Sequence, residues 1–170
     1  MFPVFEVKKE ISVIKFLRLV PLLSLLSAPL VAAGSAERAF ETFKSLHGKW
    51  AIQSSGKTLP IEMTYEVGSN GSIVMEQFGK ELSVIYSDGK SLLMTHFCNG
   101  GNQPRLRLKE NARPGTFEFE MFDITNLKDA DAPHVQRIVY KIMDEGKIEL
   151  EIIWKKDQSE ELEKYVLTRI

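Results

Sequence analysis

The sequence predicts an all-β protein: an antiparallel meander barrel of about 8–10 strands preceded by one short N-terminal helix. Hydrophobic and polar residues alternate with period two over most of the chain after residue 48, as in strands that bury one face. Turns rich in glycine separate these runs at short intervals, and such short links join only antiparallel neighbours. A meander of this size removes its free edges by closing into a barrel.

A short helix is predicted at the start of the domain. Ser35 is the expected N-cap, and Glu37 in the first turn complements the helix dipole. Gly48 is the residue expected to end the helix. An apolar face at helical spacing lies between them and consists of Phe40, Phe43 and Leu46.

Strands are predicted from there to the C-terminus. The clearest is 148–155, in which Ile148, Leu150, Ile152 and Trp154 alternate with charged residues. Asn-Gly and Asp-Gly supply the positive φ that tight hairpin turns require. The predicted turns lie at 68–71, 79–80, 87–89, 99–102, 114–115, 144–146 and 157–159, and the only longer link is 126–133.

The segment 91–98 departs from the alternation. Leu92, Leu93 and Met94 place apolar groups on both faces of this strand, whereas a strand with a wet outer face carries them on one face only. The apolar outer face must therefore be covered, either by the predicted helix or by a second molecule. If a second molecule covers this face, the protein is either a homodimer or an interaction module of the cell envelope.

The composition is that of one soluble globular domain. The chain has 170 residues, of which 44% are hydrophobic and 26% charged, with a formal net charge of −1. These values exclude collagen-like and disordered chains, and the balanced charge lacks the basic surface that a nucleic-acid partner requires. Cys98 is the single cysteine, so an internal disulfide is excluded. We expect it to be a small, buried structural residue.

The first 33 residues have the pattern of a secretory signal peptide. The chain carries no charge between Arg18 and Glu37; basic residues precede this apolar run and small residues follow its end at Ala33. The run is short for a bilayer span, and two prolines interrupt it. We predict cleavage near Ala33, one domain over residues 34–170, a periplasmic or secreted location, and no stable membrane anchor after cleavage.

The start of the first predicted strand, Gly48-Lys49-Trp50, follows a short helix and in this position resembles the Gly-x-Trp motif of the lipocalin and calycin barrels. In that superfamily the tryptophan packs across the barrel base, and a basic residue from the last strand lies over it. Arg169 occupies the matching place in this chain. The resemblance implies a calycin-type barrel in which Trp50 and Arg169 are structural.

A more local pair of motifs is Thr95-His96-Phe97-Cys98 followed by Gly101-Asn102-Gln103-Pro104-Arg105. It resembles a group of bacterial exported proteins of the lipocalin-like, DUF1579-like kind, which carry Thr-His-Tyr-Cys and Gly-Asn-Gln-Pro-Arg. Phe97 stands in place of the tyrosine and removes a hydroxyl. This resemblance implies a fold and leaves the activity open.

The candidate ligand-binding residues are His96, Asn102, Gln103, Arg105 and His134. In the functional interpretation, Arg105 offers a planar fork to a carboxylate at the barrel mouth, and the amides add hydrogen bonds. In the structural interpretation, the amides cap their own turn and Arg105 pairs with a neighbouring carboxylate. The sequence leaves both open.

A second hypothesis is a metal- or thiol-dependent enzyme that uses His96, Cys98 and His134. His96 and Cys98 are two residues apart on a strand and so share a face. The alternative is that the first two are packed core residues and that His134 hydrogen-bonds within its loop. The chain lacks Gly-x-Ser-x-Gly, a phosphate-binding loop and His-Glu-x-x-His, and we predict no cofactor and no metal.

The leading hypothesis is ligand binding. A closed barrel of this size has an interior about large enough for its own side chains or for one small ligand. The sequence does not distinguish a filled interior from an open one. We predict an exported barrel that holds a small, partly apolar molecule near His96 and the 102–105 segment.

Overall fold

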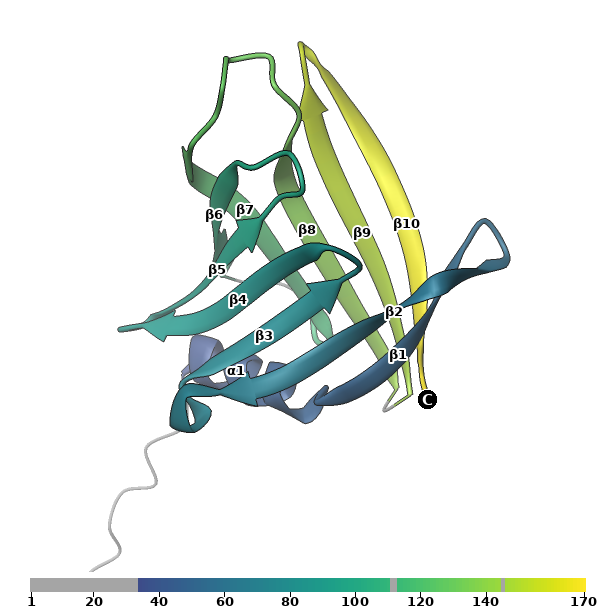
Figure 1. The fold of residues 1–170 in the computed structure, drawn as a ribbon. Coiled ribbons are helices and arrows are strands. Elements are labelled where there is room, and N and C mark those ends of the chain that lie inside the picture. Colours follow the sequence, from purple (N-terminus) through teal and green to yellow (C-terminus); the bar gives the residue numbers. More distant parts are fainter. Residues whose placement is uncertain (1–33, 111–112, 145) are drawn as a thin grey trace, which may run out of the picture. The chain divides into compact units, whose positions relative to one another are not determined.

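The structure, a computed structural model, describes residues 34–110, 113–144 and 146–170, and shows one helix followed by a closed antiparallel barrel (Figure 1). The predicted fold class is confirmed. The predicted signal peptide, residues 1–33, lies outside the described residues. The elements are α1 (Ser35–Ser45), β1 (Gly48–Ser54), β2 (Lys57–Gly68), the 3-10 turn η1 (Ser69–Gly71), β3 (Ile73–Phe78), β4 (Glu81–Asp88), β5 (Ser91–Phe97), β6 (Gln103–Leu108), β7 (Thr116–Thr125), β8 (His134–Asp144), β9 (Lys147–Lys156) and β10 (Ser159–Arg169).

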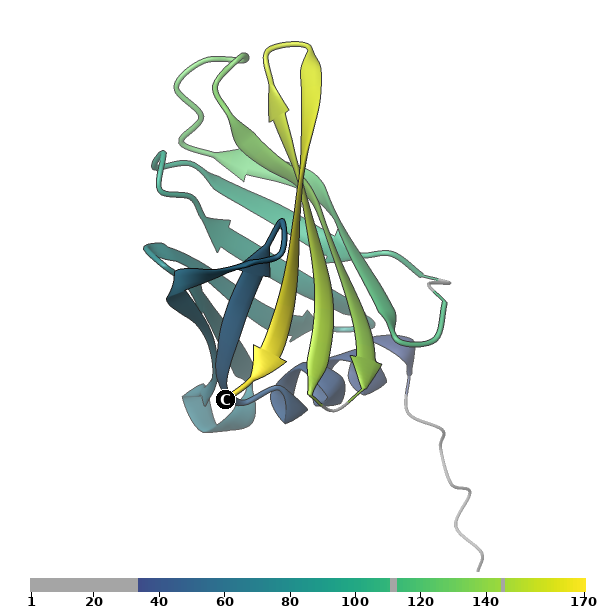
Figure 2. The same ribbon diagram turned by 90° about the vertical axis from the view of Figure 1, so that its right-hand side faces the viewer.

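Each strand pairs with the next one in the chain, and β1 pairs with β10 to close the barrel. The α1 helix lies across one end, which we call the closed end, where β1 begins and β10 ends (Figures 1 and 2). The links β1–β2, β3–β4, β5–β6, β7–β8 and β9–β10 lie at the opposite end, which we call the open end. The meander therefore fixes which side chains face each opening.

The closed end is filled by side chains. Phe43 of α1 is fully buried, and its ring makes edge contacts with Phe117, Phe119 and Tyr140 at centroid distances of 5.4, 5.6 and 5.1 Å. Aromatic pairs at these distances add to the stability gained from the buried area. The barrel interior next to α1 is therefore occupied by packed aromatic side chains.

The helix starts one residue earlier than the capping pattern predicts. Gly34 is the N-cap, and its carbonyl accepts a hydrogen bond from the Arg38 amide at 3.0 Å. Ser35 is the first helical residue, so the prediction that it caps the helix is wrong. The backbone supplies the first helical bond here, and no side chain caps the helix start.

The helix is joined to the barrel through Trp50 and Arg169. The Trp50 ring is fully buried and donates a hydrogen bond from Nε1 to the Leu46 carbonyl at 2.9 Å. The Arg169 guanidinium lies 4.5 Å from the centre of this ring and donates to the carbonyls of His47 and Ser45 at 2.8 and 3.0 Å. This is the arrangement that the calycin resemblance implies, and it satisfies carbonyls at the helix C-terminus.

Gly48 begins β1 and does not directly end the helix, whose C-cap is Leu46. Its φ of +128° is one that side chains disfavour, and a Cβ there would lie 3.3 Å from Arg169 Nη1. The glycine is therefore required both by the backbone turn and by the close approach of the arginine.

We expect Arg169→Met to lower the free energy of unfolding by about 1–2 kcal/mol, because methionine keeps much of the packing but loses the cation–π contact and the bonds to the helix carbonyls. Urea unfolding measures the change. Lys164→Met on the same strand is the control, because Lys164 is exposed on the outer wall. A change for Arg169→Met no larger than that of the control would contradict the anchoring role.

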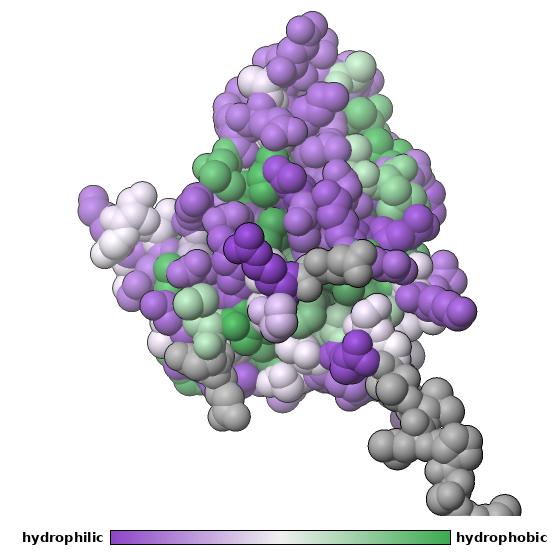
Figure 3. Space-filling model, turned by 180° about the vertical axis from the view of Figure 1, so that it is seen from behind, coloured by the Kyte–Doolittle hydropathy of each residue, from purple (hydrophilic) through white to green (hydrophobic). Residues whose placement is uncertain are grey.

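The outer wall is largely solvated. Figure 3 shows a face on which hydrophilic side chains predominate and hydrophobic ones form smaller patches. Leu93, on the outer side of β5, is only 7% exposed, so this chain alone already covers it. The exposed large hydrophobic residues are Ile61, Val67, Phe97, Phe122, Met143, Leu162 and Ile170. Among the described residues, no helix combines the length and the apolar character needed to cross a bilayer.

Candidate functional site

The two local motifs form the two sides of one hairpin at the open end. Residues 95–97 end β5, Cys98 follows directly, and residues 101–105 lead into β6. The Cys98 amide donates to the Asn102 carbonyl at 3.0 Å, and the Gly101 amide donates to the Cys98 carbonyl at 2.9 Å. Strand alternation then turns His96 into the barrel, where it is 5% exposed.

Below the open end, a row of polar side chains crosses four adjacent strands on the inner face. The register pairs Tyr65 with Glu76, Glu76 with Ser83, and Ser83 with His96. All four residues are buried. Directly paired residues on one face have neighbouring Cβ atoms, so this row is a continuous polar track through an otherwise apolar interior.

A carboxyl group lies in the middle of this track. Glu76 accepts a hydrogen bond from the Tyr140 hydroxyl at 2.7 Å. Burial raises the pKa of Glu76, while the Tyr140 and Ser83 hydroxyls act in the opposite direction. Burial raises the pKa of Tyr65, and the nearby charge of Glu76 raises it further. The Tyr65 hydroxyl is buried without a hydrogen bond of good geometry.

His96 is the end of the track that faces the opening. Its Nδ1 is hydrogen-bonded to Ser83 Oγ at 3.0 Å, whereas its Nε2 is buried without a hydrogen bond. Glu81 Oε2 lies 3.8 Å from Nε2, too far for a hydrogen bond. Burial lowers the pKa of His96 to about 4, so the imidazole is neutral at physiological pH.

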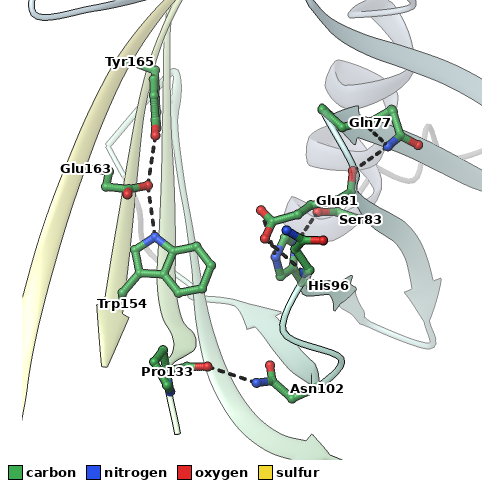
Figure 4. A network of polar contacts seen from close by, with 11 residues as sticks. Gln77, Glu81, Ser83, His96, Asn102, Pro133, Trp154, Glu163 and Tyr165 are labelled. Atoms are coloured by element: carbon green, nitrogen blue, oxygen red, sulfur yellow. Dashed lines mark hydrogen bonds and ion pairs between the residues drawn. The ribbon is translucent and has the colours of Figure 1, made fainter. Parts of the chain in front are cut away.

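Six side chains near the open end are linked by successive contacts, and we call them the rim ring: Phe78, Glu81, His96, Trp154, Glu163 and Tyr165. Phe78 pairs with Glu81 across β3 and β4, and its ring meets Tyr165 at 5.1 Å. Glu163 Oε2 accepts hydrogen bonds from Tyr165 at 2.9 Å and from Trp154 Nε1 at 3.1 Å. The Trp154 ring centre lies 6.5 Å from that of His96, and Figure 4 shows Trp154, Glu163 and Tyr165 on one side and Glu81, Ser83 and His96 on the other.

The carboxyl groups of the rim ring influence each other. Burial raises the pKa of Glu81, and the charge of Glu163 raises it further, while the Asn99 amide, which donates to Glu81 Oε1 at 3.1 Å, lowers it. The pKa of Tyr165 is raised by burial and by its bond to Glu163. The opening thus combines negative charge with three aromatic rings.

The remaining candidates of the hairpin differ in where they lie. Asn102 is buried; its Nδ2 donates to the Pro133 carbonyl at 3.0 Å, and its Oδ1 makes no hydrogen bond (Figure 4). Gln103 bonds the Gly101 carbonyl at 2.7 Å and Thr125 Oγ1 at 2.8 Å, and so caps its own turn. Arg105 is exposed and pairs with Asp123 on the outer wall. The structure therefore does not bring Gln103 or Arg105 into the interior.

His134 and Cys98 lie close to the open end, where His134 is hydrogen-bonded through Nδ1 and Cys98 is a buried thiol. His134 Nδ1 donates to the Ala132 carbonyl at 2.8 Å, as expected of a loop histidine. Burial raises the pKa of the Cys98 thiol to about 11, which leaves it protonated at neutral pH. Within the described part of the chain, no three His, Cys, Asp or Glu side chains form a group able to hold a metal ion.

Comparison with known protein families finds none that matches this chain, and comparison with curated proteins finds no similar sequence. The architecture, a closed antiparallel barrel with an arginine over a base tryptophan, is compatible with a lipocalin-like or calycin-like fold.

Sequence reasoning missed most of the rim ring. Phe78, Glu81, Glu163 and Tyr165 lie at strand ends or within strongly charged segments and resemble ordinary surface or core residues. One signal in the sequence pointed to a polar site inside the barrel. Glu76 and Ser83 occupy inward positions of alternating strands, where polar residues are rare.

Proposed function

We propose that the chain is exported and that its barrel binds a small, partly apolar molecule within the rim ring. The observation that carries this proposal is the pair of buried polar atoms without hydrogen bonds, His96 Nε2 and Asn102 Oδ1, at the open end. Buried polar atoms without partners cost about 1–3 kcal/mol each, and a ligand that bonds them would remove that cost.

The surroundings support the same proposal. Trp154, Tyr165 and Phe78 supply the apolar walls, while the aromatic cluster around Phe43 fills the closed end. Ligand sites are typically apolar pockets with a small number of placed polar groups. The signal-peptide pattern of residues 1–33 and the resemblance of the 95–105 hairpin to exported bacterial proteins support action in the periplasm or outside the cell.

The test is the fluorescence of Nile red, a neutral apolar dye, titrated with the full-length protein. We expect saturable binding with increased emission, and Trp154→Ala is expected to weaken it about tenfold because the variant loses one aromatic wall. Phe122→Ala removes an exposed aromatic ring from the outer wall, 44% exposed, and should leave binding unchanged.

Circular dichroism establishes that each variant is folded, and Trp154→Phe, which keeps an aromatic ring, is expected to restore most of the affinity. Absence of saturable binding to the wild type would refute the proposal. Equal weakening by Phe122→Ala and Trp154→Ala would place the dye on the outer surface and would refute it as well.

A further inference from the structure

We propose that the ligand of the rim ring is an organic ammonium ion: a protonated primary or secondary amine on a small apolar body, with its nitrogen between Glu81, Glu163 and His96. This inference rests on the proposed ligand-binding function and specifies the chemical class of the ligand. It follows from the polar groups of the rim ring: its two N–H and O–H donors, Trp154 Nε1 and the Tyr165 hydroxyl, already donate to Glu163, which leaves acceptors without a donor.

The proton on His96 is assigned by its neighbours. Ser83 is paired with Glu76 across β3 and β4, so the carboxyl is the acceptor beside the Ser83 hydroxyl, and the proposed tautomer directs the Ser83 proton to it. In this tautomer Ser83 Oγ accepts a hydrogen bond from His96 Nδ1, at 3.0 Å. The imidazole is neutral because burial lowers its pKa to about 4. Nε2 is left with a bare lone pair, which can only accept a hydrogen bond.

The other free atoms are acceptors too. Asn102 Oδ1 is a buried amide oxygen without a hydrogen bond, on a residue 4% exposed. Glu81 and Glu163 add carboxylates: the side chain of Glu81 is only 21% exposed, while Glu163 is exposed and already accepts from Trp154 and Tyr165 through Oε2. A ligand with a carboxylate or phosphate would bring more acceptors and more negative charge to this site. A ligand with N–H donors and a positive charge satisfies it.

The spacing fits one nitrogen. His96 Nε2 and Glu81 Oε2 are 3.8 Å apart, and a single ammonium nitrogen can reach both at a normal hydrogen-bond length of about 2.9 Å. The Trp154 ring lies against His96, and the Tyr165 ring lies against Phe78. Aromatic faces attract ammonium groups through their quadrupoles, so aromatic rings near the carboxylates are compatible with a cationic ligand.

No basic side chain in the described part of the chain offsets this charge from within. The buried polar residues are Glu76, Ser83, His96, Asn102 and His134, with no lysine or arginine among them. Lys155 and Lys164 directly follow ring residues, and the alternation turns both to the outer wall, where Lys164 pairs with Glu151 at 3.3 Å. A metal cation is a poor alternative, because the ring carboxylates and His96 do not form a metal-binding group.

The experiment is displacement of Nile red by three probes that share a phenyl body and differ in the head group: phenethylamine, phenethyl alcohol and hydrocinnamate. We expect phenethylamine to bind about tenfold more tightly than the alcohol, and hydrocinnamate to bind most weakly. Glu81→Gln and Glu163→Gln should each weaken amine binding about three- to tenfold and change alcohol binding less than about twofold.

Glu120→Gln is the matched control. It removes the same charge from the outer wall, where Glu120 pairs with Lys109 at 3.0 Å, and should leave the preference intact. Alcohol or hydrocinnamate binding as tight as that of the amine, or an equal loss for Glu120→Gln and Glu81→Gln, would overturn the inference while leaving Nile red binding in place. Failure of Nile red to bind would instead refute the proposed function itself.

Discussion

Trp50→Ala is expected to lower the free energy of unfolding by about 3–5 kcal/mol, the usual cost of truncating a large buried aromatic residue. The Trp50 ring is fully buried and contacts Tyr65 at 6.2 Å and the Arg169 guanidinium at 4.5 Å. Its Nε1 also holds the Leu46 carbonyl next to the end of α1. The variant therefore leaves a cavity and separates the helix from the base of the barrel.

Urea unfolding followed by far-ultraviolet circular dichroism measures this change without relying on the lost fluorophore. Phe97→Ala is the control, because Phe97 is 42% exposed on the outer side of β5, and its effect should remain within about 0.5 kcal/mol. A loss below about 1 kcal/mol for Trp50→Ala would show that the base tryptophan does not hold the closed end together.

The barrel could be predicted because alternation and turn chemistry act locally. Ile148, Leu150 and Ile152 are buried, as their period-two spacing predicts. The helix is another local feature, and only its first residue is misplaced, because the Gly34 backbone supplies the cap. Because the links are short, consecutive strands must pair with each other, which makes the sheet a meander. A meander of this many strands removes its two free edges when the first strand pairs with the last, as β1 does with β10.

The candidate site could be predicted only in part, because its residues come from strands that are brought together only when the barrel closes. Glu81 and Glu163 are far apart in the sequence and belong to segments that look like solvated strand ends. Glu81 comes within 3.8 Å of His96, and Glu163 comes close enough to influence Glu81, only because the closed barrel brings β4, β5 and β10 to the same end. Arg105 was a candidate that the structure places outside the site. Its residue type suggests anion binding, but its two neighbours in β6 face inward, so Arg105 faces outward and pairs with Asp123 on the outer wall.

The polar track also has a cost that pH can reveal. Buried groups whose pKa differs between the folded and unfolded chain make stability pH-dependent. Burial raises the pKa of Glu76 and Glu81, so each favours the fold at low pH and loses that contribution as the pH rises. Burial lowers the pKa of His96, and its contribution has the opposite sign.

We therefore expect His96 to make the fold acid-sensitive. Its pKa is about 4 in the folded chain against an ordinary value of 6.5, so its contribution is fully present above pH 6.5 and is lost as the pH falls toward 4. The full loss corresponds to about 3 kcal/mol, since each pKa unit is worth about 1.4 kcal/mol. Urea unfolding of wild type and His96→Gln across this range measures it as the difference between the two curves.

Glu81 is the group most able to change this result, because its carboxylate lies 3.8 Å from Nε2 and would attract a protonated imidazole. Glu81→Gln, alone and combined with His96→Gln, separates that attraction from the cost of burial. We expect the pH-dependent difference in the free energy of unfolding between His96 and its Gln variant to remain when both chains also carry Glu81→Gln. A wild type that keeps its stability relative to His96→Gln down to pH 4 would mean that His96 is protonated in the fold. In that case Nε2 would be a donor, and the opening would no longer consist of acceptors alone.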